Sequence, residues 1–229
     1  MSSISKNGRY VAFSSNAFNL VPNDTNGWDD IFVHDRQIGA TKRVSVSSNG
    51  IQGNFFSDHP SISADGRYVA FWSFSSNLVS NDTNGQADIF VNDSQTGMTV
   101  RVSISSNGTQ GNGSSFGHSI SADGRYVAFS SNAFNLVPND TNGASDIFAH
   151  DRQTNMTSRL SIDSSGNQAN NVSGSPSISA DGRYVTFHSV ASNLVTNDTN
   201  GVSDVFVHSR YQLSGTVLFE DGLTPVPDV

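Results

Sequence analysis

The chain has 229 residues, no cysteine and a formal net charge of −8 at pH 7. The lack of cysteine excludes disulfides, zinc–thiolate sites and cysteine nucleophiles. The acidic balance argues against a nucleic-acid partner, which would require a basic stripe. No run of residues approaches the roughly 18 apolar residues that a membrane span needs. Regular clusters of Val, Ile, Phe and Tyr indicate a packed β protein rather than a disordered chain.

A stretch that begins Asn-Asp-Thr-Asn-Gly occurs four times and defines the period of the chain. Its glycines recur every 58 residues, at Gly27, Gly85, Gly143 and Gly201. A fixed period of this size is typical of a repeat architecture. We predict four repeats, over residues 2–58, 59–116, 117–174 and 175–212.

The third repeat illustrates the predicted elements in chain order. Four strands are expected, over residues 119–121, 125–130, 146–150 and 158–162. An Asp-Gly turn at Asp123 and Gly124 joins the first two strands, because these residues tolerate positive φ. The long loop over residues 131–145 carries the Asn-Asp-Thr-Asn-Gly motif. No stretch has helical periodicity, so each repeat is predicted to be a four-stranded antiparallel meander.

The strands are apolar on both faces, with Tyr126 and Ala128 on one side and Val127 and Phe129 on the other. A sheet with one solvated face would alternate apolar and polar residues. Sheets buried on both faces are what β-propeller blades require. The alternative is a β-solenoid, but its coils are usually shorter than this period. We therefore predict an all-β fold, a β-propeller of four-stranded antiparallel blades.

Two repeated motifs carry a resemblance to a known family. Ser-Ile-Ser-Ala-Asp-Gly-Arg-Tyr-Val-Ala-Phe occurs at residues 61–71 and 119–129, and nearly so at 177–187, and Asp-Ile-Phe-Val follows in register. These motifs resemble the WD40-like, TolB-like (PD40-type) β-propeller repeats of bacteria, over residues 2 to about 210. The resemblance implies part of a larger propeller, in a periplasmic, extracellular or cell-surface protein. It is specific for fold and not for function.

The end of the chain departs from the repeat after His208. Residues 216–219 are one candidate for the fourth strand of the last blade. Alternatively, residues 213–229 resemble the opening of a carboxypeptidase-regulatory-like β-sandwich domain, and we favour this second interpretation. The first residues lack the basic and apolar regions of a signal peptide. We therefore interpret the chain as a piece of a longer protein.

The repeated loop is a candidate calcium site. In the first copy Asp24, Asn26 and Asp30 provide closely spaced side-chain oxygens, and Gly27 permits a sharp bend. Calcium prefers about six to eight hard oxygen ligands. The equivalent candidate ligands in the other copies are Asp82, Asn84 and Asp88; Asp140, Asn142 and Asp146; and Asp198, Asn200 and Asp204.

Turn chemistry is the alternative role for this loop, because Asp and Asn side chains bond their own backbone. Asp30 is then expected to accept backbone N–H groups or to pair with a repeated arginine, one of Arg9, Arg67, Arg125 and Arg183. A feature that is nearly identical in four blades suits a scaffold better than a catalytic site. We favour the structural role and keep calcium as the one cofactor to test.

No catalytic signature is present. The chain has no Gly-x-Ser-x-Gly elbow, phosphate loop or dinucleotide fingerprint, and Glu220 is its single glutamate. His34, His150 and His208 occupy one equivalent position, where the second repeat has Asn92. Because each belongs to a different blade, they are not expected to share a metal. We predict no catalytic residue and no enzymatic activity.

Aromatic residues that differ between the repeats are the candidate ligand-binding residues. Trp28 is replaced by Gln, Ala and Val in the later copies, and Trp72 and Phe74 replace Ser14 and Asn16 of the first. Exposed aromatic rings stack on sugars or anchor protein partners. The alternative is that they fill gaps between blades, as would Phe55, Phe56 and Phe116 in the inter-blade loops.

Three functional hypotheses remain from the sequence. The first is a non-catalytic propeller that binds a protein or glycan partner. The second is a calcium-binding adhesion or lectin-like propeller. The third is the propeller portion of a hydrolase whose catalytic domain lies elsewhere. If the four blades form an open arc, their exposed end faces predict self-association.

Overall fold

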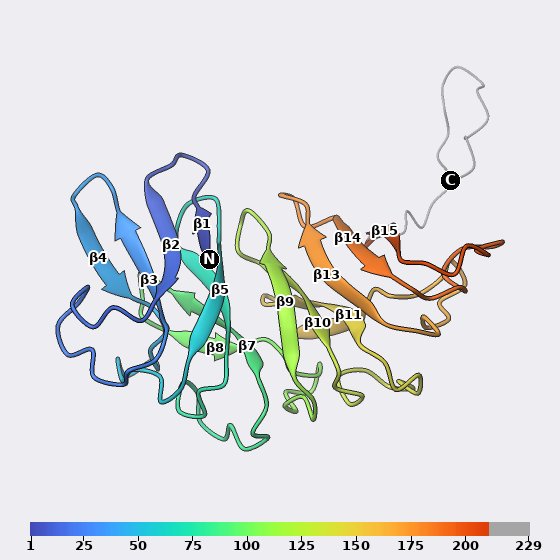
Figure 1. The fold of residues 1–229 in the computed structure, drawn as a ribbon, viewed down its shortest axis with the longest axis horizontal. Helices are drawn as coiled ribbons and strands as arrows, with labels where there is room; N and C mark the ends of the chain where they lie inside the picture. The colour runs from blue at the N-terminus through green and yellow to red at the C-terminus, as the bar shows by residue number, and fades with distance from the viewer. Residues whose placement is uncertain (211–229) are drawn as a thin grey trace.

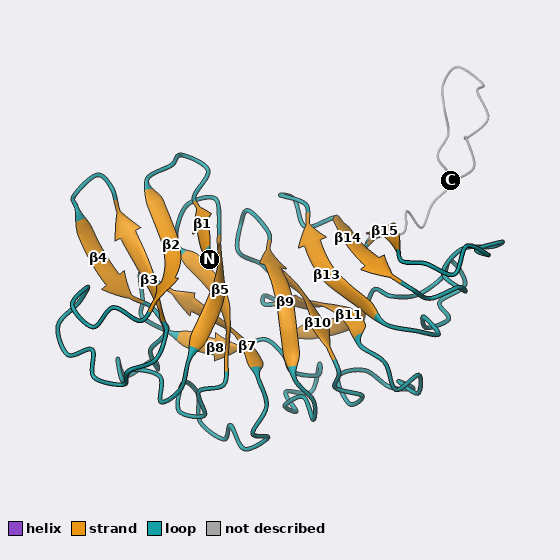
Figure 2. Ribbon diagram, in the orientation of Figure 1, coloured by secondary structure: helices purple, strands orange, loops and turns teal. Residues whose placement is uncertain are grey.

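The structure is a computed structural model that describes residues 1–210. These residues form fifteen β-strands joined by loops, without a helix (Figure 1; Figure 2). The described residues accordingly contain no helix long and apolar enough to cross a membrane. The strands are β1 (Ser2–Ile4), β2 (Tyr10–Ser15), β3 (Asp30–Asp35), β4 (Ala40–Arg43), β5 (Ser57–Ile62), β6 (Tyr68–Ser73), β7 (Asp88–Asp93), β8 (Thr99–Arg101), β9 (Ser115–Ile120), β10 (Tyr126–Ser131), β11 (Asp146–Asp151), β12 (Met156–Arg159), β13 (Ser173–Ile178), β14 (Tyr184–Ser189) and β15 (Asp204–Ser209).

Consecutive strands pair into four antiparallel sheets, here called blades 1 to 4. Their orders are β1-β2-β3-β4, β5-β6-β7-β8, β9-β10-β11-β12 and β13-β14-β15. Figure 1 shows the blades side by side in chain order, from the blue N-terminal sheet to the orange and red one. This arrangement confirms the predicted all-β propeller architecture. Both interpretations of residues 213–229 concern a segment outside the described residues.

All four strands of the third repeat have bounds that differ from the prediction, by no more than one residue at either end for β10 and β11 and by more for β9 and β12. Strand β9 begins at Ser115 rather than at residue 119, because a bulge with Gly117 at φ 45° lets pairing with β10 continue as far as Ser131. Strand β12 ends at Arg159 rather than at residue 162. The Leu160 N–H still donates to the Ile147 carbonyl at 2.7 Å, but the Ile147 N–H donates to the Ser161 side chain at 3.1 Å instead of to a backbone carbonyl.

The apolar core lies between successive blades. One face of blade 1, its forward face, packs against the opposite face of blade 2, its rear face. Blades 2 and 3 and blades 3 and 4 repeat this contact. In blade 3, Ala128 belongs to the forward contact and Phe129 to the rear one, and both are fully buried. The predicted burial of both strand faces is thereby confirmed.

The Asp-Gly turns are also part of this inter-blade contact. Gly66 has φ 80°, and a Cβ at this position would lie 2.1 Å from Cδ2 of Tyr10 in the preceding blade. Gly124 and Gly182 meet Tyr68 and Tyr126 in the same way. Glycine therefore meets two requirements at once, a left-handed backbone and close approach of an aromatic ring.

Candidate functional site

The repeated Asn-Asp-Thr-Asn-Gly loop connects the second and third strands of each blade. In blade 1, Asn23 and Gly27 both have left-handed φ values, 59° and 72°. The amide of Asn26 donates to Oδ2 of Asp30 at 3.0 Å and to the Gly53 carbonyl at 2.9 Å. Its Oδ1 accepts the Trp28 N–H at 3.1 Å. One side chain thus ties the loop to the following strand and to the connection into blade 2.

An arginine from the fourth strand lies between the two carboxylates of the loop. Nη1 of Arg43 is 3.1 Å from Oδ1 of Asp24 and 3.1 Å from Oδ2 of the fully buried Asp30. Burial raises the pKa of Asp30, whereas the hydrogen bond from Ser45 and the charge of Arg43 act in the opposite direction. Both loop carboxylates are therefore paired with a cation of the chain itself.

Blades 2 and 3 repeat this geometry. Arg101 lies 3.1 Å from Asp82 and 3.2 Å from Asp88. Arg159 lies 3.3 Å from Asp140 and 3.6 Å from Asp146. In blade 3, burial and the neighbouring carboxylate raise the pKa of Asp140 to about 6. The loops of blades 1 to 3 therefore share the same ion-pair network, in which one arginine contacts two aspartates.

The prediction that Asp30 pairs with an arginine of the Arg9 set is wrong. Arg9 instead donates two hydrogen bonds to Asp35, at 2.9 and 2.6 Å. Strand register explains the difference, because Tyr10 faces Asp35 across the β2–β3 pair, whereas Arg43 faces Phe32 near the start of β3. Arg67 and Arg125 pair with Asp93 and Asp151 in the same way.

Calcium at these loops stays a prediction. The structure brings Asp24, Asn26 and Asp30 together, but a calcium ion in the first three blades would have to replace a guanidinium group. Among the described residues, no group of three or more His, Cys, Asp or Glu could hold a metal. In blade 4, Asn200 donates to Asp204 at 2.9 Å, and the residue one period after Arg159 is Val217.

The non-repeated aromatic residues form one cluster across blades 1 and 2. We call it the aromatic cluster, and it consists of Trp28, Phe55, Phe56, Trp72 and Phe74. The Trp28 and Phe55 ring centroids are 4.3 Å apart, and those of Phe55 and Phe56 are 5.1 Å apart. Phe56 then lies 5.2 Å from both Trp72 and Phe74. These separations suit favourable tilted and edge-to-face ring contacts.

The aromatic cluster is only partly covered. Exposed fractions are 41% for Trp28, 36% for Phe55 and 39% for Phe74. The indole N–H of Trp72 donates to Nδ1 of His59 at 2.8 Å, and His59 follows Asp58 on β5 with φ 55°. A hydrogen-bonding edge therefore lies beside the exposed rings.

The structure brings together all three residues selected from the sequence, Trp28, Trp72 and Phe74. Phe56, which joins them, and His59 were not selected. A signal for Phe56 was present, because the equivalent positions hold Ser114 and Val172. What could not be read from sequence was that the inter-blade connection folds against β6.

The equivalent histidines are structural. His150 on β11 bonds Thr157 at 2.9 Å through Nδ1, and Asn92 bonds Thr99 at the same distance in blade 2. Burial lowers the pKa of His150 to about 4.

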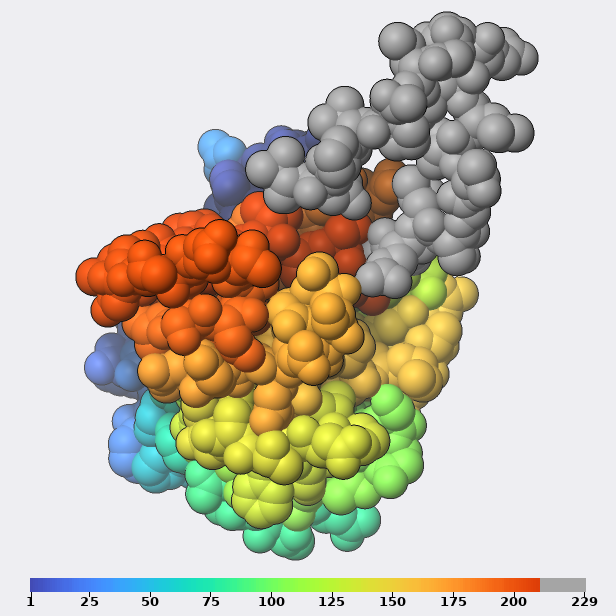
Figure 3. Space-filling view, turned by 90° about the vertical axis from the view of Figure 1, so that its right-hand side faces the viewer, coloured from blue at the N-terminus to red at the C-terminus, as the bar shows by residue number. Residues whose placement is uncertain are grey.

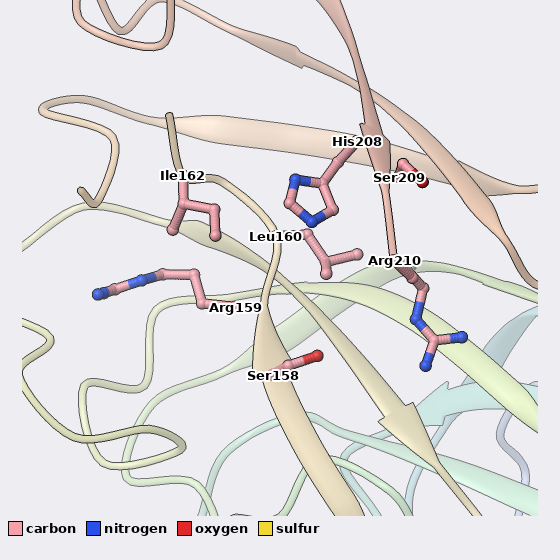
Figure 4. Close-up of a pocket in the computed structure, with 7 residues that line it drawn as sticks. All are labelled: Ser158, Arg159, Leu160, Ile162, His208, Ser209 and Arg210. Carbon is pink, nitrogen blue, oxygen red and sulfur yellow. The ribbon is translucent and has the colours of Figure 1, made fainter. Parts of the chain in front are cut away.

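A cleft lies between β12 and β15, beside His208 (Figure 4). Its lining residues are Ser158, Arg159, Leu160, Ile162, His208, Ser209 and Arg210. At the two preceding interfaces the corresponding space is spanned by an outer strand, as shown by the hydrogen bonds from Oγ1 of Thr99 to Val46 and of Thr157 to Ile104. We therefore assign this cleft to blade packing rather than to ligand binding.

No family model and no curated protein matches this chain. Several solved structures do match it. TolB from Acinetobacter baumannii is 18% identical with a TM-score of 0.53, and the match covers 91% of this chain and 40% of that one. TolB from Agrobacterium tumefaciens is 18% identical with a TM-score of 0.54, over 90% of this chain and 64% of that one. The β-propeller domain of the Trilobed protease from Pyrococcus furiosus is 12% identical with a TM-score of 0.54, over 93% and 54%. The chain spans less than two thirds of each of these structures, and its fold is that of a TolB-like β-propeller.

Proposed function

We propose that this protein is a non-catalytic propeller scaffold that binds a partner through the aromatic cluster. The observation that carries the proposal is that the cluster occurs once, although the repeats around it are nearly identical. At the position of Trp72 the other blades have Ser14, Ser130 and His188. A cluster needed only to hold two blades together would be expected at every interface. The interface between blades 3 and 4 forms without any member of the cluster, and at the interface between blades 2 and 3 only Trp72 packs against the core.

The cluster suits a partner that presents a flat apolar surface. Such surfaces are the apolar face of a sugar ring, or an aromatic or aliphatic side chain of a protein. His59, which is 41% exposed at its side chain, and Asp58 lie beside the rings and provide polar contacts at the edge. The proposed partner is therefore a glycan or a protein.

A glycan array probed with the labelled chain, followed by calorimetry on each hit, tests the glycan form of the proposal. Alanine at Trp28 should weaken binding at least about tenfold, as expected for the loss of a partly exposed aromatic anchor. Alanine at Phe134 is the matched control, since this residue is 65% exposed and belongs to blade 3. Binding that is unaffected by Trp28→Ala would contradict the site.

The protein form of the proposal is tested by photo-crosslinking. A photoreactive phenylalanine at Phe74 in the chain, added to bacterial envelope extract, should capture a defined partner band. The same residue at Phe134 should not capture that band. Absence of both glycan binding and a Phe74-specific band would refute a binding role for the cluster.

A second candidate is the propeller portion of a hydrolase. It is supported by the structural likeness to the propeller domain of the Trilobed protease. In this case the aromatic cluster would face a catalytic domain in the same polypeptide, and the propeller itself would remain inactive. The gene's full reading frame distinguishes the two candidates, because only the second requires a hydrolase domain beside the repeats.

We also propose a periplasmic or cell-surface location, supported by the resemblance of the repeats to bacterial TolB-like proteins. Fractionation of the native host, with detection by an antibody against the repeats, tests it. Recovery in the cytoplasmic fraction would contradict it.

A further inference from the structure

Two aspartates without counterparts in the other blades flank the aromatic cluster. At the position of Asp29 the other blades have Ala, Ser and Ser, and at the position of Asp58 blades 3 and 4 have Phe and Gly. The other aspartates of residues 1–210, apart from Asp163, recur with the 58-residue period. These two carboxylates therefore belong to the same local departure from the repeat as the rings themselves.

Both carboxylates lie at the edges of the cluster. Asp29 follows Trp28 and is exposed, and its carbonyl accepts a backbone N–H from the start of β5 at 2.8 Å. Asp58 faces Trp72 in the register of β5 and β6. Oδ2 of Asp58 lies 3.4 Å from Nδ1 of His59, the atom that accepts the Trp72 indole N–H. One carboxylate is thus at the Trp28 end of the cluster and the other at the Trp72 end.

The backbone at His59 also departs from the repeat. Its φ is 55°, in the left-handed region, where the equivalent Gly117 and Ser175 have 45° and 52°. Glycine adopts this conformation without steric cost, whereas a residue with a Cβ is strained there. In blade 2 the strained position carries an imidazole that holds the Trp72 indole through a 2.8 Å hydrogen bond. Strain of this kind is concentrated at functional sites, and here it lies between Asp58 and the rings.

The described part of the chain supplies no arginine or lysine to these groups. Within residues 1–210, Asp58 has ionic contacts with the Met1 amino group at 3.9 Å and with the His59 ring, and Asp29 has none. The guanidinium groups that lie over a ring in this range all lie over tyrosines, and none lies over a ring of the cluster. The rings and both carboxylates are therefore open to a cation from another molecule.

The chain itself shows how an arginine uses an aromatic ring and a carboxylate together. Arg9 lies over the Tyr10 ring, 4.8 Å from its centroid, and donates two hydrogen bonds to Asp35. Arg67 and Arg125 repeat this arrangement in blades 2 and 3. A guanidinium is planar, so its face stacks on the ring while its edge donates to the carboxylate. The aromatic cluster has the ring and the carboxylate of this arrangement but not the arginine.

The free polar atoms beside the rings favour a ligand that donates hydrogen bonds. Ionised carboxylates only accept, whereas a guanidinium has five donors and no acceptor. Sugar hydroxyls both donate and accept, and so also require donors from the protein. The amide of Asn54, which precedes Phe55, is already engaged with Ser76, because it donates to the hydroxyl and accepts the backbone N–H, both at 3.0 Å. Acceptors next to exposed rings match a guanidinium better than a neutral sugar.

We propose that the aromatic cluster binds an arginine side chain of a partner protein. The exposed rings hold the face of the guanidinium, and Asp29 and Asp58 attract its positive charge from the two ends of the cluster. This inference rests on the proposed function, because it assigns the chemistry of the partner at the same site. Figure 3 shows blade 4 in orange and red in front, and parts of blades 1 and 2, which carry the site, in blue and cyan behind it.

Titration of the 229-residue chain with two short peptides tests the ligand class. The probe is acetyl-Gly-Arg-Gly-Arg-Gly-amide, and the control peptide has citrulline, which has nearly the same shape without the charge, in place of arginine. The two tryptophans of the chain, Trp28 and Trp72, both belong to the cluster, so their fluorescence reports binding there, and calorimetry gives the affinity. The arginine peptide should bind at least about tenfold more tightly. Equal binding of the two peptides, or no binding of the arginine peptide at up to about 10 mM, overturns the proposal.

Variants that remove one charge locate the contact. Asp29→Asn and Asp58→Asn should each weaken binding of the arginine peptide about threefold, as expected for a partly exposed ion pair. Asp65→Asn is the matched control, because it removes the same charge from the turn at the other end of blade 2. Asn7 already occupies the equivalent position and accepts the same serine and arginine hydrogen bonds. This control should bind like the unchanged chain, and unchanged circular dichroism shows that each variant is folded. Equal losses in all three variants, or none in the first two, overturn the proposal.

The partner found for the cluster separates this inference from the proposed function. A glycan hit or a Phe74-specific cross-linked band that is lost in Trp28→Ala but unchanged in Asp29→Asn and Asp58→Asn would retain the binding site and overturn the arginine assignment. A band that weakens in both carboxylate variants, and that the arginine peptide but not the citrulline peptide displaces, is the expected result.

Discussion

Nη1 of Arg43 lies 3.1 Å from a carboxylate oxygen of Asp30, which is completely buried. The same arginine reaches Asp24, so one cation serves two carboxylates inside the loop for which the sequence suggested calcium. The Arg43 side chain is 9% exposed. The side chain of Arg9, which pairs with Asp35, is 37% exposed.

Replacing Arg43 by methionine should destabilise the protein by about 3 kcal/mol or more, since removal of one partner leaves buried carboxylates unpaired. Arg9→Met is the matched control, and the loss of its exposed pair with Asp35 should cost less than about 1 kcal/mol. Urea denaturation followed by tryptophan fluorescence measures both values. If both variants lost the same free energy of unfolding, burial of the ion pair would not determine how much it contributes to stability.

Calcium should not bind to the loops of blades 1 to 3 at micromolar concentration, because a guanidinium already lies between their two carboxylates. Isothermal titration of the chelator-treated chain should give no heat from three equivalent sites. The melting temperature should be the same in calcium and in chelator. Several equivalent sites, together with a lower melting temperature in chelator, would instead establish the calcium-binding alternative.

Stability should become less sensitive to acid when His150 is replaced by asparagine. Burial lowers the pKa of His150 from 6.5 to about 4. Between these values the unfolded chain binds a proton that the folded chain does not, so stability falls as the pH falls, by up to about 3 kcal/mol. Asparagine does not titrate, and Asn92 already occupies the equivalent position with the same threonine bond.

The measurement is the free energy of unfolding at pH 7, 6, 5 and 4.5 for both proteins. At pH 7 the variant should lose no more than about 1 kcal/mol, a typical cost of a buried substitution. The raised pKa of Asp140 acts with the opposite sign in this range, but it is common to both proteins and cancels in the difference. If the free energy of unfolding depended on pH in the same way in both proteins, the lowered pKa of His150 would be contradicted.

Alanine at Gly66 should destabilise the protein more than alanine at Gly27. Both glycines have left-handed φ, 80° and 72°, so the backbone strain is shared. A Cβ at Gly66 meets the Tyr10 ring, whereas a Cβ at Gly27 has no neighbour within 4 Å. We expect about 1 kcal/mol for Gly27→Ala from strain alone, and about 1–3 kcal/mol more for Gly66→Ala from overpacking.

Thermal and urea unfolding compare these two variants, and a Tyr10→Gly background supplies the control, because the Cβ of Tyr10 would also lie 2.9 Å from a Cβ at Gly66. With the ring removed, Gly66→Ala should cost no more than Gly27→Ala. A cost that persists without Tyr10 would assign the role of Gly66 to the turn alone.

Local features of the sequence were sufficient to predict the propeller. The 58-residue period, the Asp-Gly turns and the two-sided apolar strands depend on neighbours in the chain and on backbone preferences, which a single repeat displays. Ala128 and Phe129 show this directly, because their alternation along one strand correctly predicts burial on both faces.

Only the tertiary structure decided which residues meet. Arg9 and Arg43 recur with the same period, so periodicity could not show that the first pairs with Asp35 and the second with Asp30. Strand register decides it. Trp28, Phe56 and Trp72 come from a loop, an inter-blade connection and a strand, and their cluster exists because packing of blade 1 on blade 2 brings these segments together. Contacts across the blade interface depend on that packing, and the sequence of one blade does not encode them by itself.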